Sequence, residues 1–180
     1  MRKRAVLLVL SLVLGAASAH ARTLDRIAAV AGDHVILLGE VQARARPYIT
    51  LAARQEKDPL ALARLTTKAL RETCERLIDE ALIDDEANRR HLTVGEDEVD
   101  KAIATVATQN NFTLDQLYAE ARNQGYDPAT YRTEIEHVLL EYKLVQLRGA
   151  TGDQAKVDAA RKEMLAELRA RVYVEDRLAP

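Results

Sequence analysis

The chain has 180 residues, with 26 Lys and Arg against 28 Asp and Glu, no Trp, one Phe and one Cys. Only 7 Gly and 4 Pro interrupt a sequence dominated by the strong helix formers Ala and Leu, which disfavours an all-β sandwich or barrel. A single Cys excludes an intramolecular disulfide framework and a cysteine-rich zinc site, and the length suits one domain with at most an appendage.

The first 21 residues have the pattern of a secretory signal peptide. A basic start precedes an apolar run from Ala5 to Ala17, and Ala19-His20-Ala21 supplies the small residues that signal peptidase requires. The alternative is a membrane anchor, but a helix of this apolar run extends only about 20 Å, short of the roughly 30 Å apolar core of a bilayer. We therefore expect export to the periplasm with no stable membrane anchor, after cleavage behind Ala21 or, as second choice, Ala19.

The mature chain is expected to be acidic. Removing residues 1–21 takes away three basic residues and no acidic one, which leaves an excess of acidic residues. Nucleic-acid binding draws its affinity from concentrated basic surface, so nucleic acid is not an expected partner.

A hairpin opens the mature chain. Residues 24–31 and 34–37 are short apolar segments, and Gly32-Asp33 between them is a two-residue hairpin signal. Two strands alone are marginal in water. The triplet Val172-Tyr173-Val174 is the only comparable cluster downstream, so we expect it to complete an antiparallel sheet with the hairpin.

Two helices are predicted next. The first covers residues 39–55 and contains Pro47, which predicts a kink or a break near residues 43–46. The second has Asp58 as its N-cap, Pro59 at its first position and an apolar stripe up to about Arg90. At about 48 Å it would project beyond a small core unless other helices pack along it.

Four further helices are indicated by their N-terminal caps. Thr93 to Glu96 and Thr113 to Gln116 read as capping boxes, Asp127-Pro128 caps a third helix, and Asp153 caps a last one that ends near Arg171. Short polar loops between them favour antiparallel packing. The fold class expected is therefore mainly α: a multi-helix core with a small antiparallel sheet formed by the N-terminal hairpin and a C-terminal strand.

Three stretches carry a family resemblance. Residues 24–38 look like the opening strand pair of the SurA family of periplasmic chaperones, and residues 164–174 are similar to its C-terminal helix and strand. The most specific match is Gln109-Asn110-Asn111-Phe112-Thr113-Leu114-Asp115-Gln116, with Ala102-Ile103 before it and Tyr131-Arg132 after it. The resemblance implies one chaperone domain of the SurA or trigger-factor peptide-binding type over residues 22–180, closed by a helix and strand at 153–177.

One departure from the family bears on activity. Its members typically carry one or two parvulin-type prolyl isomerase modules before the C-terminal helix, whereas here that gap is residues 149–154, far below the roughly 50 residues of a domain. The resemblance thus implies the peptide-binding core without the isomerase, and hence no enzyme activity.

No catalytic, metal or cofactor site is predicted from the residues. His34, His91 and His137 have no Ser or Cys partner at a recognisable spacing, and the acidic runs 84–86 and 96–98 cannot converge on a metal from one helix. Cys74 lies on an apolar stripe, which favours an inert buried thiol over a redox role.

The aromatic residues supply the candidate binding site. Tyr131 and Tyr142 share a helix face with Ile135 and Val138, which favours core positions for them. Three other residues, Phe112, Tyr118 and Tyr126, are the peptide-binding candidates, and the two tyrosines are expected to be exposed near a helix end and a loop.

The function expected is ATP-free holding of unfolded or extended polypeptide, in particular outer-membrane protein precursors. Two alternatives remain open. The chain could be a subunit or remnant that acts beside a separate parvulin-type isomerase, or a homodimeric structural adaptor that associates through its longest helix.

Overall fold

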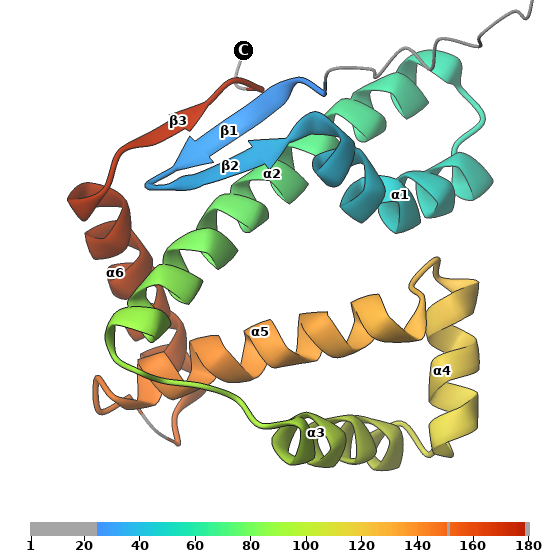
Figure 1. The fold of residues 1–180 in the computed structure, drawn as a ribbon. Helices are drawn as coiled ribbons and strands as arrows, with labels where there is room; N and C mark the ends of the chain where they lie inside the picture. The colour runs from blue at the N-terminus through green and yellow to red at the C-terminus, as the bar shows by residue number, and fades with distance from the viewer. Residues whose placement is uncertain (1–24, 151, 179–180) are drawn as a thin grey trace, which may run out of the picture.

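The computed structural model describes residues 25–150 and 152–178, so the predicted signal peptide lies outside the described residues. The described elements are β1 (Ile27–Ala31), β2 (His34–Leu37), α1 (Leu38–Gln55), α2 (Pro59–Arg89), α3 (Glu96–Gln109), α4 (Leu114–Asn123), α5 (Pro128–Gln146), α6 (Gln154–Arg171) and β3 (Val174–Asp176). The predicted mainly α fold with one small antiparallel sheet is confirmed (Figure 1).

The sheet joins the two ends of the described chain. Its strand order is β2-β1-β3, and β1 pairs antiparallel with both neighbours. Gly32, at φ +58°, forms the hairpin turn as predicted. The third strand begins at Val174 rather than Val172, because Val172 is the extended C-cap of α6. Tyr173 lies beside the turn of the β1–β2 hairpin, and its carbonyl accepts a hydrogen bond from Gly32 N–H (2.8 Å).

Helix α2 forms the centre of the main apolar core. Its C-terminal half contributes Cys74, Ile78 and Leu82, which pack with the inner face of the sheet and with α6. From α6 come Met164, Leu165 and Leu168, and α5 adds Leu144 and Val145. The predicted apolar stripe of α2 is only partly used, because Leu60 and Leu65 in its N-terminal half are exposed.

A second, smaller core joins α3, α4 and the N-terminal half of α5, which we call the α3–α5 lobe. Val99, Ile103 and Ala107 of α3 pack with Leu117 of α4, and Ile135 of α5 lies against them. Helix α5 therefore belongs to both cores, since its C-terminal end is buried with α2. Figure 1 shows the result: the lobe lies apart from the sheet, and α4 stands at its far end facing α1.

Two local expectations need correction. Of the kink or break predicted near residues 43–46, the break is absent: helix α1 continues through Pro47, since a Pro removes one backbone donor but leaves the rest of the helix bonded. The N-cap of α3 is Gly95 rather than Thr93: the carboxylate of Glu98 accepts the Gly95 N–H (2.9 Å) and also pairs with Lys143. The Lys143 ammonium also donates a hydrogen bond to the carbonyl of Thr93 (2.8 Å), which anchors the linker before α3.

A buried carboxylate links α2 to α6. Glu86 is 3% exposed and accepts hydrogen bonds from Arg90 Nε (2.6 Å) and Arg171 Nη2 (2.7 Å). Burial alone would raise the pKa of Glu86, but the hydrogen bonds from the two guanidinium groups outweigh it and hold the pKa below its ordinary value. Glu86 is therefore ionised in the folded protein, and it ties the last turn of α6 to the core helix.

Truncating the buried face of α6 should destabilise the whole fold. Leu168→Ala removes a side chain that is 1% exposed, and the expected loss is about 2–5 kcal/mol in the free energy of unfolding. Denaturant unfolding followed by circular dichroism measures it. Leu147→Ala is the matched control, because Leu147 is 60% exposed and its loss should change stability little. Equal stability of both variants would mean that α6 is not packed on α2.

The charge of Glu86 should appear as a pH-dependent term in stability. Glu86→Gln is expected to lose about 1–3 kcal/mol at neutral pH, since both arginines lose their anionic acceptor. The folded-state pKa is depressed, so the contribution is complete above the ordinary pKa of 4.5 and is lost as the pH falls through the depressed pKa. The stability difference between wild type and variant, measured from pH 7 to pH 3, should shrink accordingly, whereas Glu163→Gln on the exposed side of α6 should give no such trend.

Candidate functional site

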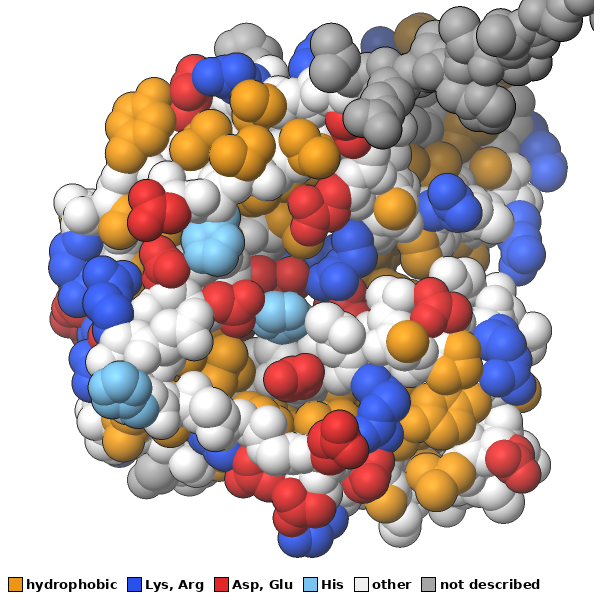
Figure 2. Space-filling view, in the orientation of Figure 1, with side chains coloured by type: hydrophobic (Ala, Val, Ile, Leu, Met, Phe, Trp, Pro, Cys, Tyr) orange, Lys and Arg blue, Asp and Glu red, His pale blue; other side chains and the backbone are white. Residues whose placement is uncertain are grey.

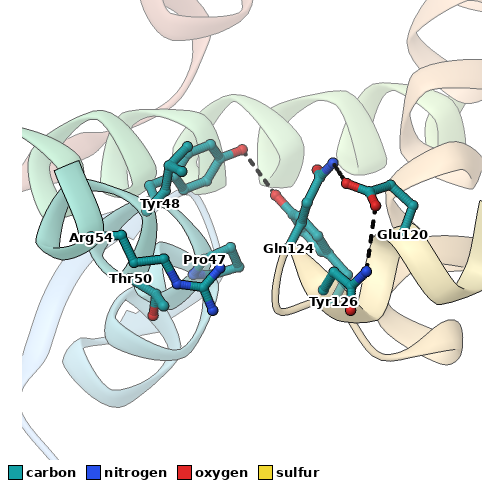
Figure 3. Close-up of a pocket in the computed structure, with 9 residues that line it drawn as sticks. Pro47, Tyr48, Thr50, Arg54, Glu120, Gln124 and Tyr126 are labelled. Carbon is teal, nitrogen blue, oxygen red and sulfur yellow. Dashed lines mark hydrogen bonds between the residues drawn. The ribbon is translucent and has the colours of Figure 1, made fainter.

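A pocket of about 490 Å³ opens between α1 and the end of α4 (Figure 3). We call it the α1–α4 pocket. Helix α1 and the segment after α4 form its two walls, which are lined by Pro47, Tyr48, Thr50, Leu51, Arg54, Glu120, Asn123, Gln124 and Tyr126. Figure 2 shows the side of the molecule on which α1 and the α3–α5 lobe face each other. Apolar and charged side chains are mixed over this surface.

A close backbone approach forms the base of this pocket. Gly125 follows α4 with φ +94°, a conformation that L side chains rarely adopt, and a Cβ at this position would lie 3.4 Å from Pro47 Cα. Pro47 is buried, so the loop after α4 rests directly on α1. This contact sets the distance between the walls and places Tyr126 opposite Tyr48.

Tyr48 is the centre of the polar contacts in the pocket. Its hydroxyl accepts hydrogen bonds from the hydroxyl of Tyr126 (3.0 Å) and from Arg76 Nη1 (2.9 Å). The guanidinium of Arg76 also lies 5.3 Å from the centre of the Tyr48 ring, a cation–π geometry. Burial and the hydrogen bond with Tyr48 raise the pKa of Tyr126, so the Tyr126 phenol stays protonated and neutral near neutral pH.

An ionic network lies behind the pocket, between the two apolar cores. Arg44 of α1 contacts Glu80 of α2 (2.8 Å) and Glu134 of α5 (2.9 Å), and all three side chains are less than a quarter exposed. Burial raises the pKa of Glu80, an effect that Arg44 offsets only in part. Farther along α5, the carboxylate of Asp84, 3.4 Å from His137 Nδ1, raises the pKa of His137, although burial opposes it.

This network is only partly satisfied. Arg44 Nε and the Nε and Nη2 atoms of Arg76 have no hydrogen-bond partner among the described residues. A cavity of about 180 Å³ lies beside them, lined among others by Glu80, His137 and Arg161. The interface between the α3–α5 lobe and the rest of the molecule, which we call the seam, is therefore polar. Moving the two parts away from each other there exposes less apolar surface than opening either apolar core.

The structure does not bring the three predicted peptide-binding residues together. Tyr126 lines the α1–α4 pocket and is half-buried rather than exposed. Tyr118 is also half-buried, because its ring stacks edge-to-face on Tyr131 (6.1 Å) in the second core. Phe112 is 40% exposed in the turn between α3 and α4, away from the pocket lining.

Two further expectations about α5 need correction. Tyr142 and Val138, expected in the core, are both largely exposed. The reason lies in the sequence of α5, where apolar residues occur on every side of the helix: Leu139 packs in the second core, Leu144 in the first, and the strip between them is left to solvent. Periodicity cannot select one face of such a helix.

Sequence reasoning missed the α1 wall of the pocket. Tyr48 follows Val41 by seven residues and so lies on the same side of α1 as the buried Val41 and Ala45, yet it is 43% exposed, and Leu51 one turn later is 53% exposed. The signal was present as two large apolar side chains one turn apart. Spacing within α1 does not tell such a pocket wall from a continued core face.

Three further observations concern the cysteine, metal binding and membrane-spanning helices. Cys74 is buried as predicted, and burial together with the nearby carboxylate of Asp176 raises its pKa to about 11. In residues 25–150 and 152–178, no cluster of His, Cys, Asp and Glu is arranged to hold a metal ion. Across the same residues no helix combines the length and the apolar character needed to cross a membrane.

The chain is similar in sequence to known proteins. The sequence model of the SurA N-terminal domain matches residues 24–145. The chain is 31% identical over 137 residues to Chaperone SurA of Sodalis glossinidius (strain morsitans), an alignment that covers 76% of the chain and 31% of that protein. It is likewise 31% identical over 138 residues to Chaperone SurA of Pectobacterium atrosepticum, covering 74% of the chain and 30% of that protein. The chain thus spans about a third of the length of the curated relatives it matches.

The contact between the two tyrosines should be measurable as a coupling energy. In a double-mutant cycle of Tyr48→Phe and Tyr126→Phe, the expected coupling in the free energy of unfolding is about 0.5–1.5 kcal/mol, because one hydrogen bond joins the two hydroxyls. Pairing Tyr48→Phe with Tyr173→Phe on the sheet side gives an additive control. Additivity in the first cycle would show that the loop after α4 does not rest on α1 in solution.

Proposed function

The chain belongs to the SurA N-terminal domain family, and on that premise we propose that it is a periplasmic chaperone that holds unfolded polypeptide, in particular outer-membrane protein precursors. The observation that carries the proposal is the α1–α4 pocket, an open site with both apolar and hydrogen-bonding walls. The relatives are named chaperones, which supports a role in handling polypeptide rather than small-molecule chemistry.

The lining of the pocket suits a segment of extended chain. Leu51 is 53% exposed and offers apolar area to a client side chain, while the amide oxygens of Asn123 and Gln124, whose nitrogens donate to Glu120, can accept hydrogen bonds from client backbone. Extended backbone has unpaired N–H and C=O groups, so a site that combines both kinds of contact recognises unfolded chain without reading a particular sequence.

The expected affinity per site is modest. Covering the exposed part of one leucine contributes on the order of 1 kcal/mol, and ordering the client chain opposes it. Useful holding then requires several contact points along one client. The described surface offers further exposed apolar side chains for this, namely Phe112, Leu114, Val138 and Tyr142. Weak, repeated contacts also allow release to a stronger acceptor without a nucleotide-driven step.

A second role is compatible with the matched length. Only 7 residues, 147–153, separate α5 from α6, and the alignments cover about a third of each relative. The chain could therefore work beside a separate prolyl isomerase and supply the holding function alone. In that case client binding is unchanged, and the partner acts on the client that this chain presents.

Suppression of aggregation tests the proposal. The mature chain should keep a urea-unfolded outer-membrane protein from scattering light after dilution. Leu51→Gln should weaken this suppression several-fold because it removes apolar area from the pocket, whereas Leu147→Gln, equally exposed but outside the pocket lining, should not. Absence of suppression at a several-fold excess of wild type would refute a holding role. A stable dimer in light scattering together with that absence would favour the structural adaptor.

A further inference from the structure

The hairpin of helices formed by residues 46–71 carries a concentration of positive charge that the composition of the whole chain hides. We call this stretch the α1–α2 arm; it comprises the end of α1, the connecting turn and the first half of α2. Only 2 of the 28 acidic residues of the chain lie in it. Its basic residues, all exposed, are Arg46, Arg54, Lys57, Arg64, Lys68 and Arg71.

The cations of the arm are not neutralised by neighbours. Within the part of the chain that the structure describes, Arg54, Arg64 and Arg71 make no ion pair, and Lys68 has only the exposed Glu72 at 3.7 Å. The two acidic residues of the arm are occupied with backbone: Glu56 accepts from the N–H of Asp58 (2.8 Å), and Asp58 caps α2.

Elsewhere the basic side chains are largely paired. On α5, α6 and the segment between them, ion pairs hold Arg132, Arg148, Arg161, Arg169 and Arg171. Most arginines there are thus neutralised within the protein, whereas the arm presents a cluster of largely unneutralised cations to solvent. Its positive potential is available to an external anion.

Exposed leucines are interleaved with these charges. Leu60 is 61% exposed and Leu65 is 41% exposed, so one side of this half of α2 faces solvent, while Leu70 on the other side packs against the main core. Leu60, Arg64 and Lys68 follow at intervals of four residues and share one face of the helix. A shallow groove of about 510 Å³ runs along the helix, lined by Ala63, Arg64, Thr67, Lys68, Arg71 and Glu72.

The arm is continuous with the α1–α4 pocket. Leu51 and Arg54 belong to both, since they line the pocket from the last turns of α1. The groove of α2 lies on the exposed side of the same arm and shares no lining residue with the pocket.

We infer that the α1–α2 arm is a second client subsite, which selects unfolded segments whose apolar residues are flanked by Asp or Glu. This inference rests on the proposed holding function and adds to it a preference for clients with acidic flanks. Unneutralised cations attract the acidic flanks, the exposed leucines contact the apolar centre, and the groove accepts extended chain. The preference is electrostatic and exposed to solvent, so it should weaken as salt is added.

Tryptophan fluorescence of the client provides a direct measurement, because the chain contains no Trp. Two peptides share one apolar centre with a single Trp, and their flanks carry either four Glu or four Gln. At low salt the mature wild-type chain should bind the Glu peptide roughly three- to tenfold more tightly. Arg64→Gln/Arg71→Gln should abolish this preference and leave the affinity for the Gln peptide unchanged.

The matched control removes the same charge from another exposed surface. Lys156→Gln/Lys162→Gln changes two exposed residues of α6 that have no ion pair among the described residues, and this variant should keep the preference for the Glu peptide. Circular dichroism should show the same helical signal for both variants.

The possible results separate this inference from the function on which it rests. Equal affinity of wild type for both peptides would overturn the inference and leave the holding function intact. If both variants lost the preference for the Glu peptide, the preference would come from net charge, and the role of the arm as a subsite would be refuted. Binding of neither peptide, together with no suppression of aggregation, would refute the holding function itself. The inference also fails if the arm variant loses binding to phosphatidylglycerol vesicles, or loses self-association in light scattering, while keeping the peptide preference.

Discussion

Burial of one half of α2 is the constraint on which the rest of the structure depends. The C-terminal half of this helix presents an apolar face that no single neighbour covers, so the sheet, α1, α5 and α6 all pack on it. The sheet in turn needs β3, because a two-stranded hairpin is marginal in water. The two ends of the described chain are therefore drawn to the same helix. The N-terminal half of α2 is left outside this core, which makes an exposed arm available.

The polar seam between the two cores has a different consequence. Arg44, Glu80 and Glu134 hold α1, α2 and α5 together through charge rather than apolar contact. Buried ion pairs recover little more than their desolvation cost, so such a seam fixes the relative position of the lobe without contributing strongly to stability. The α1–α4 pocket opens at the edge of this seam, where Tyr48 links the network to the pocket lining. A site between two such parts can adapt to clients of different shape more readily than a pocket within one core.

Much of the fold could be predicted from local signals, whereas the site could not. Caps at Asp58, Thr113, Asp127 and Asp153 are local chemistry, and each begins the helix it predicted. The faces of α5 were not predictable, because apolar residues surround that helix and only its neighbours decide which are buried. The α1–α4 pocket joins Tyr48 and Tyr126, which are 78 positions apart, and no local pattern encodes their meeting. The family resemblance indicated in outline which elements pack together but not which side chains line the opening.

Net charge describes this surface incompletely for the same reason. The acidic balance of the chain argues against anionic partners only if charges are spread evenly, and here they are not. Ion pairs consume most cations of α5 and α6, while those of the arm remain unneutralised. A client chain is attracted by the charges that ion pairs within the protein leave unneutralised. The fold decides which charges these are. Because the remaining cations stand in water beside exposed leucines, their attraction is long in range but weak at contact, which suits capture and release of unfolded chain better than tight binding.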